Sequence, residues 1–407
     1  MTRKPSYRFA GYTEPWEQKK LGDVGETYTG LSGKTKEDFG HGEGKFITYV
    51  NVFNNPLTDL YGLDSVEIDD KQRRVQYGDV LFTTSSETPE DVGLSSVWLG
   101  KEDNVYLNSF CFGYRSKKDI FDLYYLAFVL RSFSVRREFM LLAQGISRFN
   151  ISKTKVMDMS INVPSLPEQT AIGSFFQDID QFISLQQRKL EVLKEQKKTY
   201  LKLLFPAKGQ TKPALRFAGF EDDWKEVKLG EIADYKNGKG YEDRQSDSGS
   251  YELINLNSIS IDGGLKRSGK FIDKADETLE KGDLVMVLSD VAHGNLLGRV
   301  AIIPESNKFV LNQRVALLRP RLNSNSEFLY SYINSNQYYF KAQGAGMSQL
   351  NISRSSVENF SVYFPSLPEQ EAIGSFFQDL DKAIAKQEEK VNQLKESKQT
   401  LLRKMFI

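Results

Sequence analysis

The chain has 407 residues, enough for two ordinary domains that each bury a core. Hydrophobic residues make up 40% of it, but no apolar run approaches the roughly 20 residues needed to span a bilayer. The single cysteine, Cys111, excludes an intramolecular disulfide and a zinc-binding cysteine cluster, so we expect a cytoplasmic protein. Lysine plus arginine equals aspartate plus glutamate, 54 each, so net charge indicates no acidic or basic partner. Basic residues dominate locally from Arg131 to Lys155, which is typical of a solvated surface.

Residues 1–163 read as a first domain of the α+β class. Short β-branched and aromatic runs, bounded by Gly, Asn, Asp and Ser, indicate strands. The predicted strands lie at residues 45–53, 79–84, 95–99 and 104–115. Apolar residues at helical spacing predict one helix at residues 122–136.

From Pro164 to residue 205 the pattern changes to that of one long helix. Alternating steps of four and three residues keep apolar side chains on one stripe for more than four heptads, as in a coiled-coil seam. At 1.5 Å per residue such a helix is about 50 Å long. The predicted seam residues are Ile172, Phe176, Ile179, Ile183, Leu190 and Leu193. Gln186 and Lys197 interrupt the seam, and such residues either specify register or lie at its edge.

The rest of the chain repeats this plan. After a linker at residues 206–215, a second domain (216–364) and a second long helix (365–407) follow. "PSLPEQTAIGSFFQDID" returns as "PSLPEQEAIGSFFQDLD", and "RFAG…W…LG" opens both copies. The second seam comprises Ile373, Phe377, Leu380, Ile384, Val391 and Leu394. The repeat predicts two similar α+β domains joined by two long helices, which pair as an antiparallel coiled coil.

Motifs for catalysis or cofactor binding are absent or incomplete. "GLSGKT" suggests a phosphate-binding loop, but Tyr28 stands where that motif requires its first glycine. "NNPLT" lacks the second proline and the aromatic residue of an adenine methyltransferase signature. The two histidines, His41 and His293, have no nearby ligand set, so we expect no catalytic and no metal-binding residues.

The order of these motifs resembles the specificity subunit of type I restriction-modification enzymes. The resemblance is carried by "LPEQ…AIGSFFQD" and "RFAG…W…LG" in both halves, and by "GDVLF", "LNQRVALLRP" and "SQLNIS" inside the domains. It covers essentially the whole chain, and its motifs recur in the same order in each half.

The resemblance implies a DNA-binding subunit that serves defence against foreign DNA and does no chemistry itself. Each target-recognition domain would read one half of a split site in double-stranded DNA, and the coiled coil would fix the gap between the halves. Two methyltransferase subunits would bind it and methylate adenine with S-adenosylmethionine. Two restriction subunits that use ATP and Mg would complete the nuclease, and this subunit itself would carry no cofactor.

Residues that read bases need paired donors and acceptors on loops held by a rigid scaffold. In the first domain the candidate DNA contacts are Lys34, Lys36, Thr84, Ser85, Ser86, Ser147, Arg148 and Asn150. In the second they are Lys239, Ser289, His293, Asn295, Arg299, Arg314, Ser348, Gln349 and Asn351. The alternative for each is ordinary solvation or local backbone capping. "LNQR", which contains Arg314, corresponds to "LNSF" in the first copy, so an arginine role there does not carry across both domains.

A second class of function stays open at this point. Two similar domains on a helical spacer would also suit a two-headed protein that binds other proteins or glycans, and zero net charge favours that reading. Salt-dependent and sequence-dependent binding of DNA would exclude it.

Overall fold

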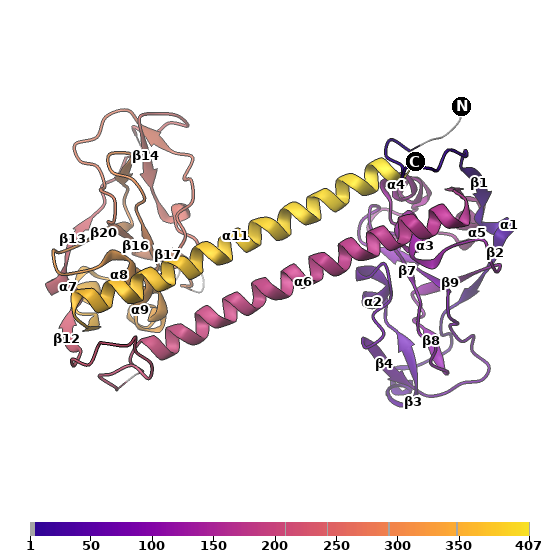
Figure 1. Cartoon of the computed structure of the whole chain (residues 1–407), viewed down its shortest axis with the longest axis horizontal. Helices are drawn as coiled ribbons and strands as arrows, with labels where there is room; N and C mark the ends of the chain where they lie inside the picture. Colours follow the sequence, from indigo (N-terminus) through magenta and orange to yellow (C-terminus); the bar gives the residue numbers. More distant parts are fainter. Residues whose placement is uncertain (1–4, 208, 242, 292–293, 347–348, 407) are drawn as a thin grey trace. The chain divides into compact units, whose positions relative to one another are not determined.

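The structure is a computed structural model of the chain and describes residues 5–207, 209–241, 243–291, 294–346 and 349–406. The chain divides into two compact units. Unit 1 comprises Met1–Gln187 and Glu389–Ile407, and unit 2 comprises Arg188–Glu388. Each unit therefore contains one of the two repeated domains together with part of both long helices (Figure 1).

Unit 1 is built on two small sheets. The first is antiparallel in the order β2-β9-β5-β7, formed by β2 (Gly25–Thr29), β9 (Cys111–Ser116), β5 (Val80–Thr83) and β7 (Ser95–Val97). In the second, β3 (Phe39–Ile47) pairs antiparallel with β4 (Leu63–Val66) and parallel with β8 (Val105–Leu107). Two short antiparallel ribbons complete the set: β1 (Glu17–Lys20) with β11 (Ser160–Val163), and β6 (Ser85–Ser86) with β10 (Phe149–Asn150).

The helices of unit 1 are short, apart from the long one. They are α1 (Leu21–Val24), α2 (Tyr49–Asn54), α3 (Leu123–Val129), α4 (Phe133–Leu142), α5 (Lys153–Asp158) and the 3-10 turn η1 (Lys36–Asp38). Thr48 and Asp122 start α2 and α3 by accepting a backbone N–H with their side chains, as N-cap residues do.

Unit 2 repeats this topology strand for strand. Its four-stranded sheet has the order β13 (Ala233–Asn237), β20 (Val315–Pro320), β16 (Leu284–Val287) and β18 (Val300–Ile302). Its three-stranded sheet has the order β15 (Phe271–Ile272), β14 (Tyr251–Ile254) and β19 (Phe309–Leu311). The ribbons are β12 (Lys225–Lys228) with β22 (Ser361–Phe364), and β17 (Ser289–Val291) with β21 (Gln349–Asn351). Its short helices are α7 (Leu229–Ile232), η2 (Leu256–Ser258), α8 (Ser326–Ser335), α9 (Gln337–Gln343) and α10 (Arg354–Glu358).

The structure confirms the α+β class and corrects three predicted elements. The strand predicted at residues 45–53 ends at Ile47, because Thr48 caps a helix there. The run at residues 104–115 is two strands separated by a turn, β8 and β9. The helix predicted at 122–136 is two helices, α3 and α4, which the chain joins at Leu130–Ser132.

The repeated "PEQ" starts each long helix and anchors it to its domain. Glu168 is 1% exposed and accepts two hydrogen bonds from Arg8, at 2.6 and 2.7 Å, and one from the Trp16 indole at 3.3 Å. Gln169 next to it is also buried; its side chain accepts the Asp122 N–H and donates to backbone carbonyls. The repeated pattern of "RFAG", tryptophan and "PEQ" therefore forms one buried polar junction, a structural rather than catalytic arrangement.

The same junction recurs in unit 2. Glu369 accepts hydrogen bonds from Arg216 at 2.8 and 2.7 Å and from the Trp224 indole at 3.2 Å. Gln370 accepts the Asn325 N–H at 3.0 Å. Because a buried carboxylate without partners is costly, each acid requires its own arginine and tryptophan, which explains why both copies keep all three.

The two long helices are α6 (Leu166–Leu204) and α11 (Leu367–Met405), each of 39 residues. In unit 1 the start of α6 packs on the end of α11, since Phe176 contacts Phe406, Asp180 contacts Lys398 and Phe182 contacts Lys390. Numbers that rise on one helix fall on the other, so the pairing is antiparallel. Unit 2 shows the same order, with Asp381 against Lys197 and Glu388 against Lys194. Every predicted seam residue is buried or half-buried.

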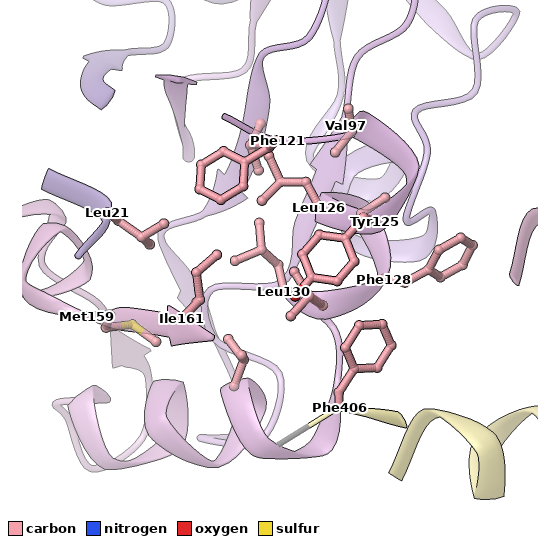
Figure 2. Packing of buried hydrophobic residues seen from close by; sticks show 14 of the residues in the cluster. Leu21, Val97, Phe121, Tyr125, Leu126, Phe128, Leu130, Met159, Ile161 and Phe406 are labelled. Carbon is pink, nitrogen blue, oxygen red and sulfur yellow. The ribbon is translucent and has the colours of Figure 1, made fainter. Parts of the chain in front are cut away.

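An aromatic residue after each long helix closes the core of a domain. The ring of Phe406 lies 5.6 Å from that of Phe176, within the main core of unit 1. It also lies 5.8 Å from the ring of Tyr125 (Figure 2). In unit 2, Phe205 takes the equivalent place, 5.6 Å from Phe377. The C-terminal end of α11 thus packs in the core of unit 1, and that of α6 in the core of unit 2.

Candidate nucleic-acid interface

The ribbon formed by β6 and β10 gathers several of the predicted DNA contacts of the first domain. Ser85 pairs with Asn150 and Ser86 with Phe149. The residue before the ribbon, Thr84, donates its backbone N–H to the carbonyl of Phe110 at 2.9 Å and its hydroxyl to the same carbonyl at 2.7 Å. The ribbon is thereby fixed against the turn that leads into β9.

Arg148 lies just before β10 and is exposed. Its Nε donates to the hydroxyl of Ser85 at 3.3 Å, and its guanidinium lies 5.9 Å from the centre of the Phe110 ring. The Ser85 side chain is buried, so it is a fixed support for the arginine. A cation beside an aromatic face is a favourable contact, and it restricts the arginine without neutralising its charge.

Tyr49 completes this group, which we call the Arg148 cluster (Tyr49, Ser85, Phe110 and Arg148). The Tyr49 hydroxyl donates to the carbonyl of Ser85 at 2.7 Å, and its ring stacks on Phe53 at 5.8 Å. Burial raises the pKa of Tyr49, and a hydrogen bond with Ser86 and, to a smaller extent, the positive charge of Arg148 oppose that rise. The cluster therefore combines two aromatic rings, one buried hydroxyl and one exposed cation.

The β17–β21 ribbon of unit 2 has the same scaffold with different side chains. Ser289 pairs with Asn351 as Ser85 pairs with Asn150, and Leu288 donates its N–H to the carbonyl of Arg314 at 2.9 Å. Around the retained serine the other three positions change. At the positions equivalent to Tyr49, Phe110 and Arg148 of unit 1, unit 2 has Leu256, Arg314 and Gln349. Arg314 is exposed and has a positive φ of 66°, an uncommon conformation for an arginine.

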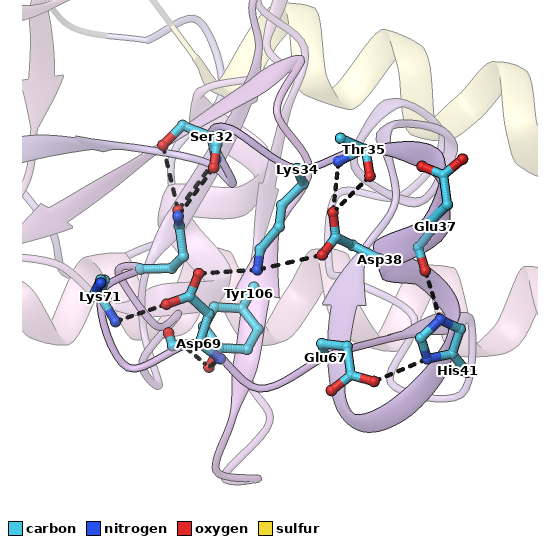
Figure 3. A network of polar contacts seen from close by, with 11 residues as sticks. Ser32, Lys34, Thr35, Glu37, Asp38, His41, Glu67, Asp69, Lys71 and Tyr106 are labelled. Carbon is cyan, nitrogen blue, oxygen red and sulfur yellow. Dashed lines mark hydrogen bonds and ion pairs between the residues drawn. The ribbon is translucent and has the colours of Figure 1, made fainter.

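The remaining candidates of the first domain lie in different surroundings. Lys34 forms an ion pair within the domain: its ammonium lies 2.9 Å from the carboxylate of Asp69 (Figure 3). Its side chain is only 13% exposed, and the hydrogen bond with Asp69 raises the pKa of Lys34. Lys36, Ser147 and Asn150 are exposed, and Ser86 is buried. The loop before Lys34 contains a necessary glycine, because a Cβ on Gly30 would lie 2.1 Å from the carbonyl of Asn108.

In the second domain the candidates also separate into exposed and supporting residues. Lys239 is exposed, 3.9 Å from Asp276, and Asn295 is exposed and accepts from Lys341 at 3.3 Å. Arg299 is half-buried and donates to the carbonyl of Asn334 at 3.1 Å, so it stabilises the position of α8. His293 and Ser348 lie outside the described residues.

The basic run from Arg131 to Lys155 is not simply a solvated surface. Arg131 donates to the carbonyls of Val52, Phe53, Asn55 and Ser95, and Arg136 to those of Glu90, Val92 and Gly93. Burial lowers the pKa of each of these two arginines to about 10. Both stabilise loops, whereas Arg148 in the same run is exposed.

Sequence reasoning missed Tyr49 and Phe110 as members of the site. Phe110 had one usable signal, its position opposite Arg314 in the aligned copies. Tyr49 had none, because the run of β-branched and aromatic residues around it is typical of a strand. Among the described residues, no three His, Cys, Asp or Glu side chains gather where they could hold a metal, and no helix is long and apolar enough to cross a bilayer.

Comparisons with known proteins agree with this architecture. A family model described as the type I restriction modification DNA specificity domain matches residues 13–195 and 221–396. The chain is 23% identical to the type I restriction enzyme MjaVIII specificity subunit of Methanocaldococcus jannaschii, over 96% of this chain and 91% of that protein.

Two solved structures share the fold. The S subunit of a type I restriction-modification system from M. genitalium matches with a TM-score of 0.61 and 17% identity, covering 100% of this chain and 99% of that one. A chain from a study of complex assembly and conformational transition in a type I system matches with a TM-score of 0.60 and 17% identity, covering 98% and 99%. The two family matches span most of both repeats. The chain therefore belongs to the type I restriction-modification DNA specificity family, and it is a non-catalytic specificity subunit that recognises DNA.

Proposed function

We propose that each unit reads one half of a bipartite DNA site, through the surface around its serine-containing ribbon. One observation carries this proposal: the ribbons β6–β10 and β17–β21 have the same register around Ser85 and Ser289, but the exposed side chains beside them differ. A scaffold that is kept while its exposed polar residues change is what two different half-sites require.

The long helices set the gap between the half-sites. Both α6 and α11 contribute residues to both units, and each is a continuous helix of 39 residues, or about 58 Å at 1.5 Å per residue. The buried apolar stripe, interrupted by Lys197 and Lys398 at equivalent positions, supports a fixed register between the helices. A spacer of fixed length would leave the bases between the half-sites unread.

The catalytic steps belong to partner subunits. Two methyltransferase subunits would dock on this chain and methylate adenine with S-adenosylmethionine, and two restriction subunits would use ATP and Mg to cleave DNA. The start of each long helix also presents the same exposed side chains, Ser174 and Asp178 on α6 and Ser375 and Asp379 on α11, which supports two equivalent docking sites.

Reconstitution tests this function. The purified chain is mixed with its cognate methyltransferase subunit, S-adenosylmethionine and a DNA library, and methylated adenines are mapped by sequencing. We expect no methylation by either protein alone and methylation of one bipartite motif by the complex. A chain that forms no complex with that subunit, or a complex that methylates adenines without sequence preference, would contradict the proposal.

A further inference from the structure

Arg148 differs in its surroundings from four other arginines of unit 1. Arg8 and Arg115 each donate two hydrogen bonds to a buried carboxylate. Arg131 and Arg136 donate to backbone carbonyls and are half-buried. Arg148 is exposed, and its contacts with the described residues are a serine hydroxyl and an aromatic ring. Its charge is therefore available to a group outside the chain.

The support of Arg148 orients it for a particular kind of acceptor. Ser85 takes the Nε hydrogen of Arg148, so the two terminal nitrogens remain as a pair of parallel donors. Such a fork matches the O6 and N7 atoms of guanine in the major groove, which is the commonest specific arginine contact to a base. Because Ser85 is neutral and Phe110 is apolar, neither competes for those donors as a carboxylate would.

Unit 2 shows that this position varies while its scaffold does not. Gln349 precedes Asn351 as Arg148 precedes Asn150, and Arg314 occupies the place of Phe110. Glutamine pairs with adenine rather than guanine. Phosphates are the same in every sequence, so a change of residue type on a retained backbone is what base contacts to two different half-sites would require.

We propose that Arg148 reads a guanine in the half-site bound by unit 1, through the pair of terminal nitrogens left free by Ser85. This inference rests on the proposed function, since it assigns one base of one half-site to one residue. It makes Arg148 a specificity-determining residue, supported by Ser85, Phe110 and Tyr49.

The test compares matched variants in the complex with the cognate methyltransferase subunit. Arg148→Lys keeps the charge and loses the fork, and Arg148→Gln introduces the residue of the second copy. Arg137→Gln removes the charge of an exposed arginine on α4 that lies outside the cluster. Each complex methylates a randomised DNA library, and the preferred base at every position is read by sequencing. Circular dichroism verifies that the variants fold.

The wild type and Arg137→Gln should require a guanine at one fixed position of one half-site. Arg148→Gln should lose that preference by about tenfold or more, and Arg148→Lys should weaken it less because an ammonium can still donate to guanine; both should leave the other half-site unchanged. The inference is overturned if both variants keep every base preference, or if they lower methylation equally for all sequences, as loss of a phosphate contact would. If the wild type itself methylates no bipartite motif, the proposed function fails as well, so the two failures are distinguishable.

Discussion

The Lys197 ammonium of α6 lies 2.6 Å from the Asp381 carboxylate of α11, inside unit 2. Unit 1 contains the equivalent pair, Lys398 and Asp180, with Lys398 also 5.2 Å from the centre of the Phe128 ring. The lysines that interrupt both apolar stripes are therefore ion-pair partners of the opposite helix. Each ion pair forms only when the two helices are aligned as they are here, so it favours this register of the coiled coil over shifted ones. We call each pair a register marker.

Reversing the charge of Lys197 tests this marker. Lys197→Glu places two carboxylates in contact at a half-buried position, so we expect the free energy of unfolding to fall by about 1–2 kcal/mol. The double variant Lys197→Glu/Asp381→Lys should recover at least half of that loss. Lys189→Glu, on an exposed position of the same helix, is the control and should cost less than about 0.5 kcal/mol. Denaturant titration measures all three, and equal losses for Lys197→Glu and Lys189→Glu would contradict the marker.

The aromatic residue after each long helix should stabilise one unit only. Phe406→Ala removes a ring that packs on Tyr125 and Phe176, and such a cavity costs about 3 kcal/mol. Hydrogen exchange should show faster exchange in the core of unit 1, with the core of unit 2 unchanged. Phe205→Ala is the matched variant and should do the reverse. Faster exchange in both units from either variant would show that the packing is not local.

Cys111 provides a probe of unfolding. The thiol is 2% exposed, and desolvation raises its pKa to about 12. The unfolded thiol ionises near pH 8.5, so stability is unaffected below that pH and falls as the pH rises from there toward 12. We expect no labelling by a thiol reagent at pH 8 until denaturant unfolds unit 1. Rapid labelling of the native protein would contradict the burial of the thiol. In Cys111→Ala, the free energy of unfolding should no longer show the part of its fall above pH 8.5 that the thiol causes.

The fold could be predicted from the sequence where local pattern decides the structure. The helices predicted at residues 164–205 and 365–407 have bounds within two residues of those of α6 and α11, because an uninterrupted apolar stripe at helical spacing with Pro167 or Pro368 in its first turn strongly favours a helix. The break between α3 and α4 could not be predicted. There Arg131 donates to carbonyls of Val52, Phe53 and Asn55, residues far away in the sequence, so tertiary contacts decide it.

The residues of the candidate site likewise divide into those that the sequence predicts and those that depend on tertiary contacts. The sequence predicts Ser85, Arg148 and Asn150 as DNA contacts because polar residues on loops suit base reading, and the structure brings Ser85 and Asn150 together in one ribbon with Arg148 beside it. That Lys34 is half-buried against Asp69 was not visible, because the two are distant in sequence. Phe110 and Tyr49 join the cluster through backbone contacts of Thr84 and Ser85, which no local pattern encodes.

Lengthening both long helices tests their role as a spacer. Seven residues are inserted after Gln187 of α6 and seven after Glu388 of α11, where the chain passes from one unit to the other. Each insertion adds about 10 Å and preserves the seam, so the gap between half-sites should lengthen while both halves keep their sequence. Insertion into α6 alone is the control and should lower stability, because it shifts the register on one side only. An unchanged gap in the doubly lengthened protein would show that the helices do not set it.

The central claim, that each domain reads one half of the site independently, is tested most directly by exchanging one domain. Residues 216–364 are replaced by the corresponding domain of another specificity subunit, and the methylated motif of the reconstituted complex is read by sequencing. We predict a motif in which one half-site is replaced and the other half-site and the gap are unchanged. A motif with both halves altered, or with neither altered, would contradict the account.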